Sequence, residues 1–256
     1  MQLHSSVNQE QVYNYRPRIT IITVCYNAEK DIEESITSVI NQTYDNYEYI
    51  IIDGGSNDRT IEMIKRYEDF ITCWVSEKDE GIYDAMNKGI DRASGEWLYF
   101  LGSDDCLAGE NVLSDIVNKL DSSIALAFGD VCYDEGRCFR SRINWRILFT
   151  NTVHHQGAFY NSFLFNTFRY NKQLKILGDY DLNLYITNNN YNYIKINRTI
   201  AFCKDDGISR QVRWRGYQEE IKIRKKYYPC ILFWIFSCYS IFKYCTKKML
   251  QLMRLY

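Results

Sequence analysis

The sequence of 256 residues has no Cys-x-x-Cys pair, only three histidines and no glycine-rich phosphate loop. Its nine cysteines are scattered, and the two most closely spaced, Cys132 and Cys138, have five residues between them. This distribution argues against a structural zinc site and favours reduced, unpaired thiols. Residues 1–17 are polar and lack the apolar segment of a signal peptide. We therefore expect them to form a loose lead-in to a cytoplasmic protein.

The missing phosphate loop also narrows the class of enzyme. Neither a Walker loop nor a GxGxxG motif follows the first apolar segment, where Tyr26 and Asn27 stand instead. A nucleotidyltransferase shares the plan of a nucleotide bound on a sheet, but it would need such a loop at this point. That class is therefore the less favoured alternative.

The formal net charge of −1 hides an asymmetry along the chain. From Arg210 onward there are eleven Lys and Arg residues against two acids, Glu219 and Glu220, whereas the preceding 209 residues carry twenty bases and thirty acids. A basic end on an acidic body indicates an anionic partner. Nucleic acid and a lipid bilayer are the two candidates.

Short apolar, β-branched segments alternate with segments that have helical periodicity. The apolar segments predict buried strands at residues 18–24, 49–52, 71–75, 97–101 and 124–131. Helices are expected at 28–42 and 82–93, and a third follows Ser56 or Asp58, either of which can cap it. This alternation predicts an α/β fold with a mostly parallel sheet and helices on both faces.

The C-terminal segment has a different pattern. Residues 227–242 contain no charge but are too few to span a bilayer, which takes about 20 apolar residues. One stripe of the expected helix is polar and comprises Ser237, Ser240, Lys243, Lys247, Gln251 and Arg254. This pattern predicts an amphipathic helix in a membrane interface, with its lysines toward the lipid headgroups. The alternative is a helix packed on its own domain or on a dimer partner.

Polar clusters follow each of the first four predicted strands. They are Tyr26-Asn27, Asp53-Gly54-Gly55-Ser56, Asp79-Glu80-Gly81 and Gly102-Ser103-Asp104-Asp105. A single strand-end Asp is usually a helix cap, but four clusters at one edge predict a crevice for a ligand. The carboxylate pair in the last cluster suits a hard divalent cation that holds phosphate oxygens.

The chain resembles the family 2 glycosyltransferases, which have the Rossmann-like GT-A fold, in the group near colanic-acid and O-antigen biosynthetic enzymes. The matching segments are ITVCYN (22–27), IIDGGSNDRT (51–60), DEGIYDAMNKGI (79–90), GEWLYFLGSDD (95–105), HHQGAFY (154–160) and GDYDLNL (178–184). The resemblance implies a donor-binding half at 18–106 and an acceptor-binding half at 107–226, followed by the helical tail at 227–256. It further implies transfer with inversion from a nucleotide sugar, most often a UDP-sugar.

The same resemblance assigns the donor site. It implies that the base and ribose are lined by Tyr26, Asn27 and Asp53, with Asp79, Asn87, Lys88 and Ser103 near the nucleotide sugar. Lys88 would approach the diphosphate. The Asp-x-Asp metal motif maps onto Gly102-Ser103-Asp104, so Asp104, with Asp105 beside it, would hold Mg²⁺ or Mn²⁺. Two positions depart from the family pattern, because Gly102 and Gly54 stand where relatives carry Asp.

In the second half the resemblance implies that Asp179 is the catalytic base, with Asp181 a weaker candidate and a helix cap the alternative role for Asp179. Gly178 replaces the Glu that is frequent there. The segment His154-His155-Gln156 would contact the acceptor or the departing diphosphate, and Arg210 would contact the anion.

The acceptor implied by this resemblance is a saccharide, including one carried on a polyprenyl diphosphate lipid, in cell-surface polysaccharide synthesis. A lipid-linked acceptor, together with the basic tail, favours a bilayer over nucleic acid as the anionic partner. We therefore expect a peripheral protein at the inner face of the cytoplasmic membrane, in contact with it through 227–256. A non-catalytic module that keeps the fold and binds nucleotide sugar or membrane is the alternative.

Overall fold

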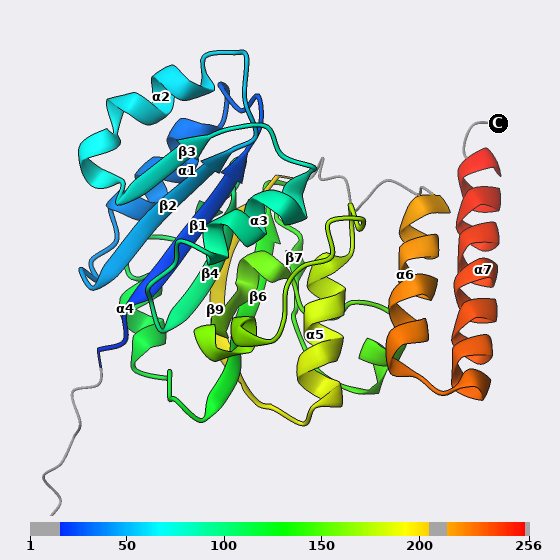
Figure 1. The fold of residues 1–256 in the computed structure, drawn as a ribbon. Coiled ribbons are helices and arrows are strands. Elements are labelled where there is room, and N and C mark those ends of the chain that lie inside the picture. The colour runs from blue at the N-terminus through cyan, green and yellow to red at the C-terminus, as the bar shows by residue number, and fades with distance from the viewer. Residues whose placement is uncertain (1–15, 205–213, 254–256) are drawn as a thin grey trace, which may run out of the picture.

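The structure is a computed structural model that describes residues 16–204 and 214–253. A nine-stranded sheet runs through it in the order β3-β2-β1-β4-β8-β6-β9-β5, with β7 paired to β6 (Figure 1). The strands are β1 (Ile19–Cys25), β2 (Tyr47–Asp53), β3 (Cys73–Ser76), β4 (Trp97–Gly102), β5 (Cys106–Leu107), β6 (Ile124–Tyr133), β7 (Cys138–Phe139), β8 (Ala158–Asn161) and β9 (Asn192–Cys203). The α-helices are α1 (Ile32–Ile40), α2 (Thr60–Arg66), α3 (Ile82–Ile90), α4 (Val112–Val117), α5 (Gly178–Asn188), α6 (Trp214–Tyr227) and α7 (Cys230–Met253).

Parallel pairing is concentrated in the N-terminal half of the sheet. Strand β1 pairs in parallel with both β2 and β4, and β2 pairs in parallel with β3. The second half is mixed, since β8 runs antiparallel to β4 and β6 whereas β9 is parallel to β6. The α/β fold class predicted from the sequence is confirmed, and the parallel character belongs mainly to β1–β4.

Two apolar cores lie on opposite faces of this sheet, because successive side chains of a strand point to opposite sides. Ile22, Ile50 and Phe100 belong to one core, which α3 and α5 cover. Ile21 and Trp97 belong to the other, which α1, α2 and α4 cover. The strands are therefore buried on both faces, and this explains why their sequences are nearly continuous apolar runs.

The last two helices lie side by side at one end of the molecule, with α7 outermost (Figure 1). A buried guanidinium joins them, since Arg224 of α6 is fully buried and donates to Ser240 Oγ (2.6 Å) and to the Phe236 carbonyl (3.2 Å) of α7. Glu220 lies 3.4 Å from Arg224 and accepts from Ser240 Oγ at 2.8 Å. Lys243 completes the network at 3.1 Å from Glu220.

This packing corrects the predicted orientation of the tail. Ser237 and Ser240 are buried, and Lys243 bonds to Glu220, so this part of the polar stripe faces the protein and not lipid headgroups. The physical reason is the buried Arg224–Glu220 pair, which needs polar partners from α7. The alternative, a helix packed on its own domain, holds for this side of α7. Arg254 lies outside the described residues. Within 16–204 and 214–253 no helix is long and apolar enough to cross a membrane.

The expectation that all cysteines are free thiols is wrong for one pair. Cys132 and Cys138 form a disulfide across the antiparallel β6–β7 pair, where they are direct register partners. Spacing could not show this, because the contact depends on the turn between the two strands. The other seven cysteines are free.

We expect Glu220→Ala to lower the free energy of unfolding by about 3–5 kcal/mol, because it leaves the buried Arg224 charge without its carboxylate. Arg59→Ala, which removes an exposed ion pair with Glu29, should cost less than about 1 kcal/mol. Urea unfolding followed by circular dichroism measures both. An equal, small effect of the two substitutions would contradict a structural role for the network.

Candidate functional site

The parallel register brings the first four strand ends to one edge of the sheet. Cys25 pairs with Asp53, Asp53 with Ser76, and Val24 with Gly102. The polar clusters that follow these strands therefore start from neighbouring positions, as the sequence predicted. The site is built from the loops at this edge.

Asp53 organises the first of these loops. Its buried carboxylate accepts from the backbone N–H groups of Gly55 (3.0 Å) and Ser56 (2.9 Å) and from Ser76 Oγ (2.6 Å). Ser56 Oγ in turn accepts from the N–H of Asn27 at 2.7 Å. The carboxylate thus fixes the loop geometry around Tyr26 and Asn27, beside which a ligand can bind.

Gly54, the first departure from the family pattern, is explained by Asp79. A Cβ placed on Gly54 would lie 2.5 Å from Asp79 Oδ2 and 3.5 Å from the ring of Tyr26. Asp79 is held there by the Gly81 N–H, which donates to its Oδ1 at 2.7 Å. The space that a side chain at position 54 would enter is therefore already occupied by a carboxylate. Asp79 and the exposed Tyr26 come together at this point.

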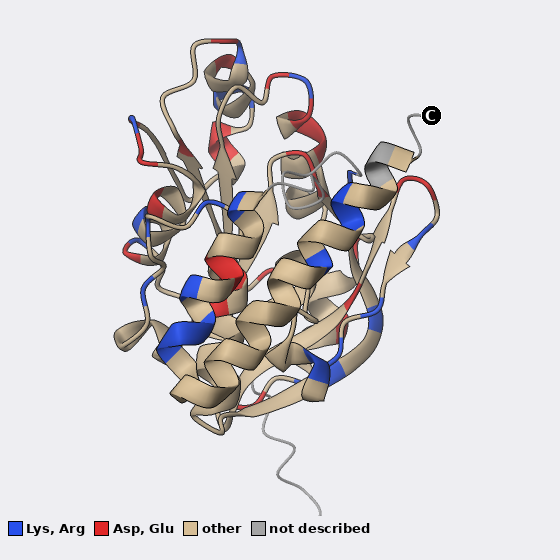
Figure 2. Cartoon of the chain, turned by 90° about the vertical axis from the view of Figure 1, so that its right-hand side faces the viewer, with Lys and Arg blue, Asp and Glu red and all other residues tan. Residues whose placement is uncertain are grey.

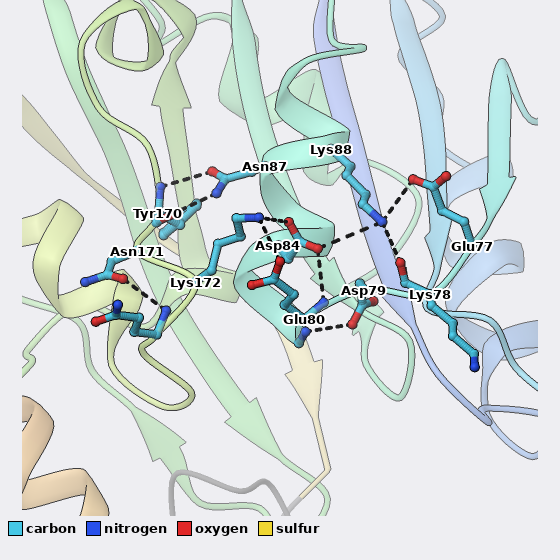
Figure 3. A network of polar contacts seen from close by, with 12 residues as sticks. Glu77, Lys78, Asp79, Glu80, Asp84, Asn87, Lys88, Tyr170, Asn171 and Lys172 are labelled. Atoms are coloured by element: carbon cyan, nitrogen blue, oxygen red, sulfur yellow. Dashed lines mark hydrogen bonds and ion pairs between the residues drawn. The ribbon is translucent and has the colours of Figure 1, made fainter.

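Asn87 and Lys88 do not belong to the cavity described below. Both ends of the Asn87 amide bond to the backbone of Tyr170, at 2.9 and 3.0 Å, and Lys88 bonds to Glu77 (2.9 Å) and to the Lys78 carbonyl (3.0 Å) (Figure 3). These partners anchor α3 to the segment 170–172 and to the end of β3. The Lys88 ammonium is bonded to these two oxygens in this structure, and its approach to a diphosphate stays a prediction.

A cavity of about 680 Å³ lies between the end of β4, the β6–β7 hairpin and the start of α5. It gathers most of the predicted metal, acceptor and catalytic residues: Ser103, Asp104, Asp105, His154, His155, Gln156 and Asp179. Residues from distant parts of the sequence thus meet in one place. Arg210, predicted to contact the anion, lies outside the described residues.

Gly102, the second departure, stands where two carboxylates converge. A Cβ on Gly102 would overlap the Asp105 carboxylate and would lie 2.7 Å from Gln156 Nε2 and 3.0 Å from Asp104 Oδ1. Asp105 is buried and accepts from the Lys204 N–H at 3.1 Å, whereas Asp104 is exposed. Burial, and then the charge of Asp104, raise the pKa of Asp105 to about 7. A positive charge placed between the two carboxylates would relieve this repulsion.

The two carboxylates fit a magnesium or manganese ion that shares its coordination sphere with phosphate oxygens and water. Mg²⁺ is commonly bound by one or two carboxylates together with substrate phosphates. Among the described residues there is no group of three or more His, Cys, Asp and Glu side chains placed to hold a metal. The two carboxylates therefore suit an ion whose other ligands come from the substrate and water. They are too few to surround a metal with protein ligands alone.

Asp179 lies in the first turn of α5, and its side chain is 14% exposed. Its Oδ2 accepts from Asn151 Nδ2 at 2.6 Å and lies 3.9 Å from His155 Nδ1. Among the described residues its Oδ1 has no hydrogen-bond partner. Burial raises the pKa of Asp179 to about 7 and lowers the pKa of His155 to about 4. At neutral pH the histidine is thus uncharged, and the carboxyl group is close to its titration point.

Two neighbouring positions define this arrangement further. A Cβ on Gly178 would lie 2.6 Å from ring carbons of Tyr83, so the tyrosine fills the space that a Glu at this position would need. Asp181 turns away from the cavity and accepts from Tyr227 Oη (2.6 Å) and Lys226 Nζ (3.1 Å). These contacts give Asp181 a role in holding α5 against α6, which separates it from Asp179.

Sequence reasoning missed Glu219, a buried residue of α6. Its carboxylate accepts from three consecutive backbone N–H groups, those of Lys175 (2.9 Å), Ile176 (2.9 Å) and Leu177 (3.1 Å). This fixes the segment that leads into Asp179. The sequence feature that could have indicated it is that only two acids, Glu219 and Glu220, occur among the eleven bases from Arg210 onward. Three cavity-lining cations were also missed, namely Arg137, Lys175 and Lys204.

Comparisons with known proteins agree with this geometry. The sequence model of glycosyl transferase family 2 matches residues 20–181. A PGL/p-HBAD biosynthesis glycosyltransferase of Mycobacterium bovis is 30% identical over 181 residues, which are 66% of this chain and 69% of the relative. The chain therefore belongs to glycosyl transferase family 2.

Solved structures share the fold at lower identity. Truncated TarS of S. aureus in complex with UDP-GlcNAc has a TM-score of 0.66 and 18% identity, over 80% of this chain and 64% of that one. The mannosyltransferase PcManGT of Pyrobaculum calidifontis, in complex with GDP-Man and Mn²⁺, has a TM-score of 0.64 and 19% identity, over 83% and 64% of the two chains. The chain thus spans somewhat under two thirds of these structures, and the likeness establishes the GT-A fold.

The buried carboxyl of Asp179 should make stability depend on pH. Its pKa is about 7 in the folded protein and about 4 in the unfolded chain. Between these two pH values the folded protein holds a proton that the unfolded chain has lost, so stability falls as the pH rises toward about 7 and levels off above it. Asp179→Asn cannot ionise at this position. Its free energy of unfolding, relative to that of the unsubstituted protein, should therefore increase by roughly 2–3 kcal/mol as the pH rises from about 5 to about 8. Chemical unfolding at several pH values measures the difference. A difference that does not change with pH would show that Asp179 titrates normally.

Proposed function

We propose that the protein transfers a sugar, with inversion, from a nucleotide sugar to a saccharide acceptor. The observation that carries the proposal is the position of Asp179: a buried carboxylate with an unsatisfied oxygen lies in the same cavity as the Asp104–Asp105 pair. Family 2 membership supplies the reaction class, and the cavity supplies a base at one end and a carboxylate pair suited to a cation at the other.

In this proposal the hydroxyl oxygen of the acceptor attacks the anomeric carbon, and Oδ1 of Asp179 accepts the proton of that hydroxyl. The new bond forms on the face opposite the bond to the nucleoside diphosphate, which leaves with the electron pair. A positioned base of this kind contributes about 10²–10⁴ in rate. Asn151 holds the other oxygen of the carboxylate, and Glu219 fixes the backbone before it. No covalent enzyme intermediate is needed.

Asp104 and Asp105 would hold Mg²⁺ or Mn²⁺ at the other end of the cavity. When bound, the ion supplies Lewis-acid neutralisation of charge on the leaving diphosphate. Lys175 and Lys204 line the same cavity, with their ammonium groups bonded to the Glu80 carbonyl and to the Asp31 carboxylate. Ser103 lies beside the carboxylate pair and is proposed to contact the nucleotide sugar.

The donor is proposed to be a UDP-sugar, with Tyr26, Asn27, Asp53 and Asp79 around its base and ribose. Tyr26 offers an exposed ring for stacking, and Asp79 offers a carboxylate oxygen beside Gly54 to accept a bond from a base N–H. The complex of TarS with UDP-GlcNAc supports the choice of nucleotide, whereas that of PcManGT contains GDP-Man. A donor screen should therefore include both nucleotides.

The acceptor is proposed to be a saccharide at the inner face of the cytoplasmic membrane, carried on a polyprenyl diphosphate in cell-surface polysaccharide synthesis. Support comes from the basic residues of the last two helices and from the relative that acts in PGL/p-HBAD biosynthesis. His155 lies beside Asp179 and Gln156 beside Gly102, and together with His154 they would contact this acceptor or the departing diphosphate.

Two neighbouring substitutions test the proposal. We expect Asp179→Asn to lower transfer by about 10²–10⁴ while UDP binding is unchanged, because only the proton acceptor is lost. Asp181→Asn should keep most of the activity, since that carboxylate bonds to Tyr227 and Lys226 outside the cavity. The donor is first found by thermal shift with UDP-, GDP- and dTDP-sugars in Mn²⁺, and nucleotide release is then measured. Near-native turnover in Asp179→Asn would rule out its role as base, and no release with any donor would favour a non-catalytic binding module.

A further inference from the structure

Helix α7 departs from an ordinary surface helix, because it buries two serines beside Phe236 and leaves most of its large apolar side chains exposed. An amphipathic helix of a globular protein turns its apolar stripe to the core and its polar stripe to water. In α7 the side chains of Ser237 and Ser240 are buried against α6, and Lys243 bonds to Glu220. The Arg224–Glu220 pair requires these partners, so it holds the helix in this rotation.

Helix α7 carries no charged residue along most of its length (Figure 2). Its exposed large side chains are Ile231, Leu232, Trp234, Ile235, Tyr239, Ile241, Phe242, Met249, Leu250 and Met253. Trp234 is 61% exposed and Phe242 is 67% exposed. Scattered exposed apolar residues are normal, but seven large ones between Ile231 and Phe242 on one helix mark a contact surface.

The charges of α7 indicate which partner covers it. The helix contains three lysines and no acidic residue, and Figure 2 shows its charged turns toward the C-terminal end. Lys247 and Lys248 are exposed there, and Lys225 is exposed on α6. A second copy of α7 has no carboxylate to pair with these lysines. An anionic bilayer offers an apolar interior for the exposed side chains and phosphates for the lysines.

We propose that α7 lies in the plane of an anionic phospholipid surface, with the face around Trp234 and Phe242 in the lipid and the Ser237–Ser240 side on the protein. The proposal deepens the proposed function by naming the surface that meets the membrane, and this is opposite to the stripe expected from sequence. Glu219 and Glu220 are neighbours on α6, one bonded to the segment before Asp179 and the other to α7. The helix proposed to meet the membrane and the segment before Asp179 are thus both bonded to α6.

Vesicle flotation of the full chain tests the proposal. We expect it to float with vesicles of phosphatidylglycerol and phosphatidylcholine, to float less with phosphatidylcholine alone, and to be released by salt. Trp234→Glu combined with Phe242→Glu should weaken partitioning by at least about tenfold. Phe70→Glu is the matched control, because Phe70 is an equally exposed aromatic residue (61%) in the 3-10 helix at Glu68–Phe70, far from α7 in sequence, and it should bind as the parent does.

Native thiols give a second measurement that does not depend on substitution. Cys238 and Cys245 are exposed on α7, whereas Cys73 is a half-buried thiol in β3. Anionic vesicles should slow alkylation of Cys238 and Cys245 by a water-soluble maleimide and leave Cys73 unchanged. Equal flotation of all variants, or a parent dimer that the α7 substitutions dissociate without any vesicle binding, would overturn the proposal. Nucleotide binding by each variant shows separately whether the donor site is intact.

Discussion

The parallel register of β1, β2 and β4 is the constraint on which the site depends. It places Cys25, Asp53 and Gly102 at one edge, so that loops from three strands share a small space. In such a space an added side chain must displace another. Gly54, Gly102 and Gly178 each stand against a side chain from another part of the chain, namely Asp79, Gln156 and Tyr83. Glycine at these positions is therefore a condition of the local packing.

Burial of acids is the second organising feature. Asp105 and Asp179 have a pKa raised to about 7 because burial disfavours their charged forms. Asp105 also faces the charge of Asp104, whereas Asp179 has the neutral His155 and the amide of Asn151 as neighbours. The two ends of the cavity thus differ: one concentrates negative charge suited to a cation, and the other keeps a single carboxyl group suited to proton transfer.

Local sequence patterns predicted the parts of the fold that are decided locally. Apolar runs located β1–β4 and β6, and strand-end clusters located the edge where the site forms. The contacts of Lys88 with Glu77 and Lys78 could not be predicted from local sequence, since they depend on where α3 docks. The orientation of α7 was wrong for the same reason, because Arg224 is an ordinary basic residue in sequence and becomes the buried centre of a network only in the fold. Glu219 likewise gains its role only when α6 packs beside the segment before α5.

In the proposed mechanism Asp179 accepts the proton of the acceptor hydroxyl. The most direct test is the pH dependence of kcat/KM for sugar transfer, which reports ionisation in the free enzyme. Because the pKa of Asp179 is raised to about 7, kcat/KM should rise about tenfold per pH unit below pH 7 and level off above it. A value of kcat/KM that stays constant down to about pH 5 would contradict the claim, because a protonated Asp179 cannot accept the proton.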